Sequence, residues 1–202
     1  MSARDAEKAF HKHLKERAFE PAYLVTGEDE YRKDAAVREL IAAAVDPATA
    51  DFNLDIRAAK ELDGDTIASL LGMPPMMADR RVVVIKDVAA LRKAARQALD
   101  RALQSPSPDC IVVLVAAAGA KADAALSKAA FTLDLGALSG DRVPKFLQHT
   151  AAQAGAAGIT DEAIILLVER VEIVTEGLNV RLRMDGLAGL AREITADIGA
   201  AA

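Results

Sequence analysis

Apolar residues occur along this chain in short unbroken runs and in rows at helical spacing. Two runs, Arg81–Asp87 and Cys110–Ala116, contain no alternation of polar residues between their ends, which is typical of parallel strands covered by helices on both faces. Shorter runs at 21–26 and 131–135 predict two more strands. Residues 51–56 alternate polar and apolar side chains, and this pattern predicts an edge strand.

Rows of apolar residues at helical spacing separate these runs. They predict helices over residues 5–18, 31–44, 88–104 and 122–129, and a short one around Ile67. Strands and helices in this rhythm indicate parallel pairing with right-handed crossovers. From Asp141 onward the pattern predicts helices alone, at 142–154 and 160–172. We therefore expect an α/β domain over residues 1–140 and a small all-helical domain over residues 141–202.

The stretch Leu62–Asp87 contains the most informative pattern. A short helix carries Ile67, Leu70 and Leu71, and Asp65 is predicted to cap its N-terminus. This helix is expected to end at Gly72 and the following proline pair, because proline lacks an N–H donor and its ring clashes with the preceding turn. Met76 and Met77 are then left in a corner at the entrance of a buried strand.

Two interpretations of this methionine pair follow from the residues. Methionine commonly fills irregular gaps in a core, so core packing is the first. Adjacent side chains that follow a proline-terminated helix do not easily face one core together, however. The second interpretation is an apolar tip that fits a groove on a partner protein.

Composition narrows the function classes. The 202 residues carry a net charge of −5 and only 3% are aromatic, which disfavours a free-standing nucleic-acid binder, since such proteins use basic surfaces and stacking platforms. The single cysteine, Cys110, cannot form an internal disulfide and is expected to be a buried, inert thiol. No signal peptide or membrane-spanning run is present in the sequence, so we expect a cytoplasmic protein without a membrane partner.

The first predicted strand is followed by a glycine and a helix, as in the phosphate-binding loop G-x-x-x-x-G-K-[ST]. Alignment on the glycine puts arginine at the second glycine position, aspartate at the Mg²⁺-binding hydroxyl position and three carboxylates inside the loop. The residues concerned are Gly27, Glu28, Asp29, Glu30, Arg32, Lys33 and Asp34. Carboxylates repel a triphosphate, so we expect a degenerate loop without ATP hydrolysis, nucleotide cofactor or metal. The sequence contains no G-x-S-x-G motif, no paired cysteines, no H-E-x-x-H motif and no conspicuous catalytic dyad. An alternative is a degenerate P-loop NTPase-like domain that acts as a nucleic-acid or protein interaction module.

Several motifs occur together in one order along the chain. They are Tyr23–Tyr31 (YLVTGEDEY), Asp51–Leu54 (DFNL), Met73–Val84 (MPPMMADRRVVV) and the Ser107-Pro108-Asp109 turn before CIVVLVA. Together they resemble the delta subunit of bacterial DNA polymerase III, over about residues 23–168. The resemblance implies an AAA+-like domain with a degenerate phosphate loop, followed by a small helical lid.

The resemblance also implies a function. In that family the apolar pair before the A-x-R-R segment is a wedge that enters the hydrophobic groove of the sliding clamp and helps to open the clamp during DNA replication. This pair corresponds to Met76 and Met77, and Leu70, Leu71 and Met73 are expected to hold or extend the wedge. Such a chain is a non-catalytic subunit of a DNA-directed DNA polymerase complex, and it contacts DNA only indirectly or weakly.

The C-terminal segment departs from the family pattern. The family continues with a helical collar that joins the other clamp-loader subunits, whereas residues 172–202 do not follow that pattern. On this ground we expect a divergent or truncated lid and a monomer that binds the clamp without joining the other loader subunits.

Overall fold

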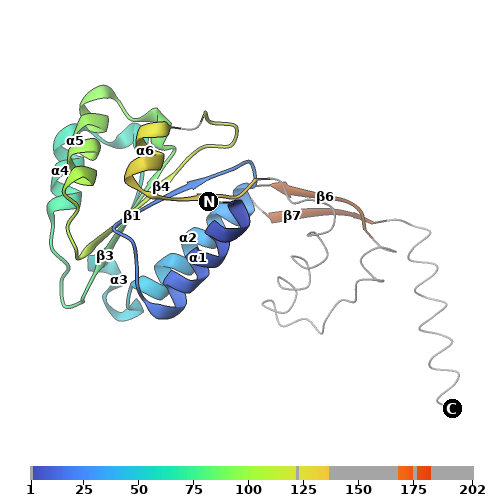
Figure 1. Cartoon of the computed structure of the whole chain (residues 1–202), viewed down its shortest axis with the longest axis horizontal. Helices are drawn as coiled ribbons and strands as arrows, with labels where there is room; N and C mark the ends of the chain where they lie inside the picture. The colour runs from blue at the N-terminus through green and yellow to red at the C-terminus, as the bar shows by residue number, and fades with distance from the viewer. Residues whose placement is uncertain (1, 122, 137–167, 175–176, 183–202) are drawn as a thin grey trace, which may run out of the picture. The chain divides into compact units, whose positions relative to one another are not determined.

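The computed structural model describes residues 2–121, 123–136, 168–174 and 177–182. The chain divides into two units, Met1–Gly136 and Ala137–Ala202 (Figure 1). The first unit contains a five-stranded parallel sheet in the order β2-β3-β4-β1-β5. Its strands are β1 (Ala22–Thr26), β2 (Leu54–Ala58), β3 (Arg81–Lys86), β4 (Cys110–Val115) and β5 (Phe131–Asp134). The predicted α/β class is therefore confirmed, and the second predicted strand does lie at an edge.

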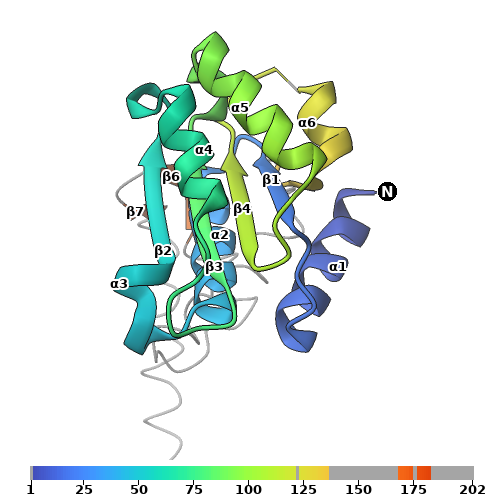
Figure 2. The ribbon, with the colours of Figure 1, turned by 90° about the vertical axis from the view of Figure 1, so that its left-hand side faces the viewer.

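Helices cover both faces of this sheet (Figure 2). The first face packs against α1 and α2, and the second against α4, α5 and α6. The helices are α1 (Ala3–Glu16), α2 (Glu30–Ala44), α3 (Ala50–Asn53), α4 (Gly64–Gly72), α5 (Lys93–Gln104) and α6 (Ala124–Ala129), with 3-10 turns η1 (Pro47–Thr49), η2 (Ala59–Glu61) and η3 (Val88–Ala90). None of the helices that the structure describes is long and apolar enough to cross a bilayer.

Alternation along β3 explains why its sequence is continuously apolar. Val82 and Val84 face the core under α1 and α2, whereas Val83 and Ile85 face the core under α4 and α5. Fully burying one such side chain contributes about 2 kcal/mol. Both faces of the central strands are therefore needed to hold the two helix layers in place.

The structure corrects two predicted element boundaries near the methionine corner. Residues 51–53 belong to the short helix α3, and the edge strand begins only at Leu54. Helix α4 is capped by Asp63 rather than Asp65, since Asp63 Oδ1 accepts a 2.8 Å hydrogen bond from the Thr66 N–H. This hydrogen bond lowers the pKa of the Asp63 carboxyl. Two aspartates flank the first helical residue, and only backbone geometry selects between them.

The predicted helix over residues 88–104 is interrupted. Asp87 adopts a left-handed conformation, with φ at 56°, and η3 follows it. The regular helix α5 begins only at Lys93. The apolar row was correct for α5, whose buried side chains are Ala95, Leu99 and Leu103.

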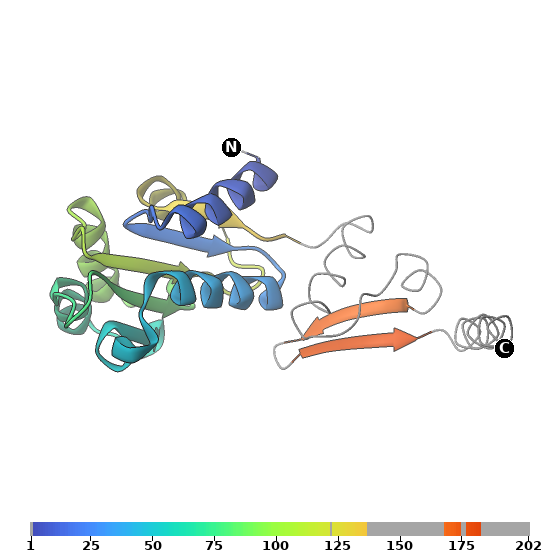
Figure 3. The ribbon, with the colours of Figure 1, turned by 90° about the horizontal axis from the view of Figure 1, so that it is seen from below.

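The second unit contains a β-hairpin where helices were predicted. Strands β6 (Val168–Val174) and β7 (Gly177–Leu182) pair antiparallel, with Val171 opposite Val180 (Figure 3). The prediction of helices alone is therefore wrong for residues 168–182. Valines and isoleucine in this stretch favour strands over helices, and Gly177 marks the turn. The predicted helix 142–154 and residues 160–167 of the next one lie outside the described residues.

Cys110 lies at the start of β4 and is buried, and burial raises the pKa of its thiol. Because the thiolate is the reactive species, we expect the native thiol to resist a disulfide reagent such as Ellman's reagent at pH 8. The same reagent should titrate one thiol in denaturant. Stoichiometric labelling of the native protein within seconds would contradict this expectation.

Candidate functional site

The methionine corner forms an exposed loop between α4 and β3. Helix α4 ends at Gly72, and Pro74 and Pro75 prevent its continuation. In the loop that follows, Met76 is 50% exposed and Met77 is 82% exposed. Core packing is therefore excluded for Met77, and the loop carries large apolar side chains in solvent. Below, residues 73–77 are called the Met tip.

The backbone of the Met tip is strained at its most exposed residue. Met77 has φ at 52°, a left-handed conformation that costs a residue with a side chain about 1–2 kcal/mol. Such strain persists only where the surrounding structure imposes it, and it is concentrated at functional sites. The side chain of Met77 gains little from packing, since most of it faces solvent.

Asn53 anchors this tip from α3. Its side-chain Oδ1 accepts a hydrogen bond from the Met76 N–H at 2.8 Å, and its Nδ2 donates to the Met76 carbonyl oxygen at 2.8 Å. The same Nδ2 also donates to the Thr49 carbonyl oxygen at 3.1 Å. Although Asn53 lies within a segment that marked the family resemblance, its role depends on a contact 23 residues away and was missed from the sequence.

Arg81 anchors the other end of the tip, where the loop enters β3. Its side chain is buried, and its Nη2 pairs with Asp55 Oδ2 at 2.5 Å. Its Nη1 lies 3.5 Å from the Met73 carbonyl oxygen, and its backbone N–H donates to Asp109. A buried charge that pairs with the edge strand and reaches the tip backbone ties this loop to the sheet.

The remaining predicted site residues lie at different depths. Leu71 is buried in the core under α4 and α5, and Leu70 is partly buried against that core. Met73 is 44% exposed. Leu71 can therefore support the tip only from below, whereas Met73 can extend its surface. Two further exposed apolar residues, Phe52 on α3 and Ile56 on β2, were not predicted as part of a site.

The glycine loop follows β1, at the C-terminal ends of the parallel strands, whereas the Met tip lies at the N-terminal end of β3. Gly27 has φ at 120°, and a Cβ there would lie 2.1 Å from the Leu135 carbonyl oxygen. The Asp29 N–H points to the same carbonyl, at 3.4 Å. This glycine therefore allows close packing against the end of β5, and one N–H of the loop is already used within the protein.

Several charged residues of this loop are held by contacts within the protein. Asp29 caps α2, accepting a 3.0 Å hydrogen bond from the Arg32 N–H, so a carboxylate already occupies the helix N-terminus. Lys33, at the position of the phosphate-binding lysine, is fully buried. Its Nζ donates to Glu30 Oε1 at 2.6 Å and to the Ala116 carbonyl oxygen at 2.7 Å. This ammonium group is therefore held by contacts within the protein and shielded from solvent.

Two other cations complete this internal pairing. Arg32 Nη2 lies 2.9 Å from Glu7 Oε1, and its Nη1 donates to the Gly136 carbonyl oxygen. Lys86, at the end of β3, lies 3.3 Å from Asp34 Oδ1. In P-loop enzymes a hydroxyl at the position of Asp34 and a carboxylate after a strand hold Mg²⁺. Here a lysine and an aspartate form a direct ion pair.

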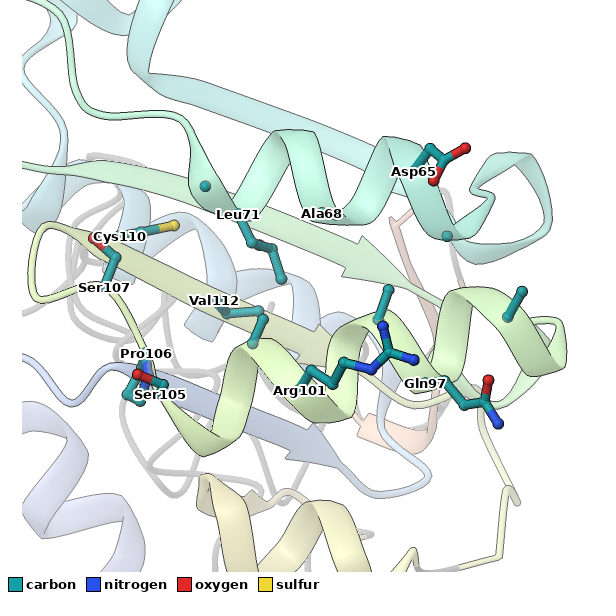
Figure 4. A pocket seen from close by; sticks show the side chains of 15 residues that line it. Asp65, Ala68, Leu71, Gln97, Arg101, Ser105, Pro106, Ser107, Cys110 and Val112 are labelled. Atoms are coloured by element: carbon teal, nitrogen blue, oxygen red, sulfur yellow. The ribbon is translucent and has the colours of Figure 1, made fainter.

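Two hollows flank the second sheet face. A groove of about 610 Å³ lies between α4 and α5, with Cys110 and Val112 of β4 at its floor (Figure 4). A second hollow, of about 390 Å³, lies at the C-terminal ends of the strands, and Glu28 and Asp134 are among the residues that line it. Within the described ranges, no three His, Cys, Asp or Glu side chains are placed to hold a metal ion.

Comparison with known sequences gives one consistent result. Residues 23–133 match the family model described as DNA polymerase III, delta subunit. The DNA polymerase III subunit delta of Bacillus subtilis is 29% identical over 113 residues, which cover 52% of this chain and 33% of that protein. The chain thus spans about a third of this curated relative.

Comparison with solved structures agrees with this result. The DNA clamp loader delta protein of Bacillus subtilis superposes with a TM-score of 0.63 at 27% identity, covering 83% of this chain and 52% of that one. A DNA polymerase III gamma subunit-related protein of Thermotoga maritima gives a TM-score of 0.53 at 16% identity, covering 72% of this chain and 52% of that one. The second likeness shows the fold alone.

Proposed function

Since the chain belongs to the DNA polymerase III delta subunit family, we propose that it binds the sliding clamp through the Met tip and helps to open it during DNA replication. The observation that carries this proposal is the 82% exposure of Met77, an apolar side chain held in solvent on a strained backbone. The clamp-binding domain would be the α/β unit, predicted over residues 1–140.

The chemistry of the tip suits a hydrophobic groove. Methionine is unbranched and polarizable, so it adapts to irregular apolar pockets. Fully burying an exposed methionine side chain contributes about 2 kcal/mol, so the exposed parts of Met76 (50%) and Met77 (82%) together offer about 3 kcal/mol. Met73 would extend the contact, while Leu70 and Leu71 would hold the tip from below.

Clamp opening would follow from differential binding. A protein shifts a conformational equilibrium only by the difference in its affinity for the two states. The tip would therefore have to bind the open clamp more tightly than the closed ring. No bond is made or broken in such a step, so the chain needs neither catalytic residues nor a cofactor for it.

Binding of the cognate sliding clamp is the direct test. We expect the chain to retain the clamp on an affinity matrix and to give a measurable dissociation constant by biolayer interferometry. A matched titration with duplex and single-stranded DNA at physiological salt should give weak or no binding, in keeping with the net charge of −5. A chain that binds DNA but not the clamp would contradict the proposal and favour a nucleic-acid module.

ATP with Mg²⁺ is expected not to stabilise the chain. Lys33 forms an ion pair with Glu30, and Asp34 forms one with Lys86. The Asp29 carboxylate caps the N-terminus of α2, where a phosphate would otherwise bind. A ligand at a hundred times its dissociation constant stabilises the native state by about 2.7 kcal/mol, which thermal shift detects readily. We expect no change in melting temperature at millimolar ATP. A clear rise would restore the nucleotide-binding interpretation.

A further inference from the structure

We propose that Asn53 is a positioning residue that holds the Met tip in its binding conformation before the partner arrives. This inference rests on the proposed clamp-binding function. It assigns a role to a residue that faces no solvent and that sequence reasoning did not select.

The hydrogen bonds of Asn53 are complementary to one peptide residue of the tip. One side-chain amide accepts from the Met76 N–H and donates to the Met76 carbonyl oxygen, both at 2.8 Å. The side-chain amide of asparagine presents a donor and an acceptor in one plane whatever the pH, and among the other side chains only the longer glutamine has the same group. Below, this pair of bonds is called the Asn53 clasp.

A third bond fixes the clasp to the body of the protein. Asn53 Nδ2 also donates to the Thr49 carbonyl oxygen, four residues earlier in the chain. The amide is therefore oriented by its own short helix as well as by the tip. Because Asn53 is fully buried, water cannot replace these bonds without opening the structure.

Strain at the neighbouring residue explains what the clasp accomplishes. Met77 adopts a left-handed backbone conformation while its side chain is mostly in solvent, so its own packing cannot impose that conformation. The clasp fixes both backbone polar groups of the preceding residue. Without it, the tip is expected to populate relaxed conformations, and the apparent dissociation constant rises as the competent fraction falls.

Asn53→Asp and Asn53→Ala test this role. Asp keeps the shape and the acceptor but loses the donor to Met76 and Thr49, and Ala removes both functions. We expect both variants to raise the clamp dissociation constant by about tenfold, mainly through slower association, because a smaller fraction of the free tip is in the binding conformation. Amide hydrogen exchange at Met76 should accelerate by about tenfold or more in Asn53→Ala, where the Met76 N–H loses its acceptor, while exchange at Val83 in the central strand keeps its native protection.

Asp63→Ala is the matched control. It removes the N-cap of α4, on the same helix–loop segment but at the end far from the tip in sequence, and should lower the melting temperature. We expect its clamp affinity and its Met76 exchange to stay within twofold of the wild-type values. Loss of affinity in this variant equal to that in Asn53→Ala would show that general destabilisation is sufficient, and would overturn the positioning role.

The outcomes separate the two proposals. A folded wild-type chain that does not bind the clamp contradicts the proposed function, while Met76 exchange still decides whether the clasp orders the tip. If the wild-type chain binds and either folded Asn53 variant keeps its affinity within twofold, the positioning role is wrong. A loss of affinity in Asn53→Ala without faster exchange at Met76 is equally contrary to it. Should Asn53→Ala fail to fold, the near-isosteric Asn53→Asp carries the test.

Discussion

Replacing both tip methionines by alanine is expected to raise the clamp dissociation constant by about a thousandfold and to leave the melting temperature nearly unchanged. Apolar anchors at the centre of an interface commonly cost about 2 kcal/mol or more each when truncated, and about 4 kcal/mol corresponds to that factor. Met76 and Met77 contribute little to the fold because half or more of each side chain is in solvent. Interferometry and calorimetry on the same protein sample would measure the two effects.

Met77→Gly sharpens this prediction, because its two effects have opposite signs. Glycine adopts a φ of 52° without steric cost, so relief of strain, less the entropy cost of glycine, should stabilise the fold by about 0.5 kcal/mol. The same change removes the side chain proposed to enter the clamp. We expect a higher melting temperature together with lost clamp affinity, a combination that unfolding cannot produce.

Ile56→Ala is the matched control for the methionine variants. Ile56 is 49% exposed, as Met76 is, but lies on edge strand β2 outside the Met tip. Its replacement should change clamp affinity by less than twofold. If the double methionine variant instead melts far lower while binding the clamp normally, the methionines are structural and the proposed site is wrong.

Lys33→Ala is expected to lower the free energy of unfolding by about 3 kcal/mol, a large effect for a single lysine. The change leaves a cavity in place of the fully buried Lys33 side chain, and both the partly exposed Glu30 carboxylate and the Ala116 carbonyl lose their donor. In a P-loop enzyme the equivalent lysine contacts phosphates. In this chain the residue is expected to affect folding instead, which urea denaturation followed by circular dichroism would measure.

Lys12→Ala provides the comparison for Lys33. Lys12 pairs with Glu16 one turn along α1, but 69% of its side chain is exposed. Exposed pairs of this kind contribute about 0.5 kcal/mol or less, so its loss should hardly change the denaturation midpoint. If the two variants had the same free energy of unfolding, the contacts of Lys33 would not stabilise the fold.

The chain pattern determined the layers of the fold. Unbroken apolar runs indicated strands buried on both faces, and β3 and β4 confirm this, because alternate residues of each strand enter the two helix-covered cores. The carboxylates after β1 likewise indicated a degenerate phosphate loop. Both features depend on residues close together in sequence, and local order is what a sequence pattern reports.

Some local predictions failed because the same short segment can form either a helix or a strand. Residues 51–53 alternate like a strand but form α3, and residues 168–172 were assigned to a helix but belong to β6. A short segment gains little from its own hydrogen bonds, so packing against the rest of the chain selects between helix and strand. Periodicity over a few residues cannot supply that information.

Contacts between distant segments were decided by the tertiary structure alone. The sequence selected Met76 and Met77 as a tip, but only the fold brings Asn53 against Met76, 23 residues away. Only the fold buries Lys33 against the Ala116 carbonyl, 83 residues away. Such contacts depend on where separate chain segments cross. The functional groups of a side chain determine which hydrogen bonds it can make. The packing of distant strands, helices and loops against one another determines which of those bonds form.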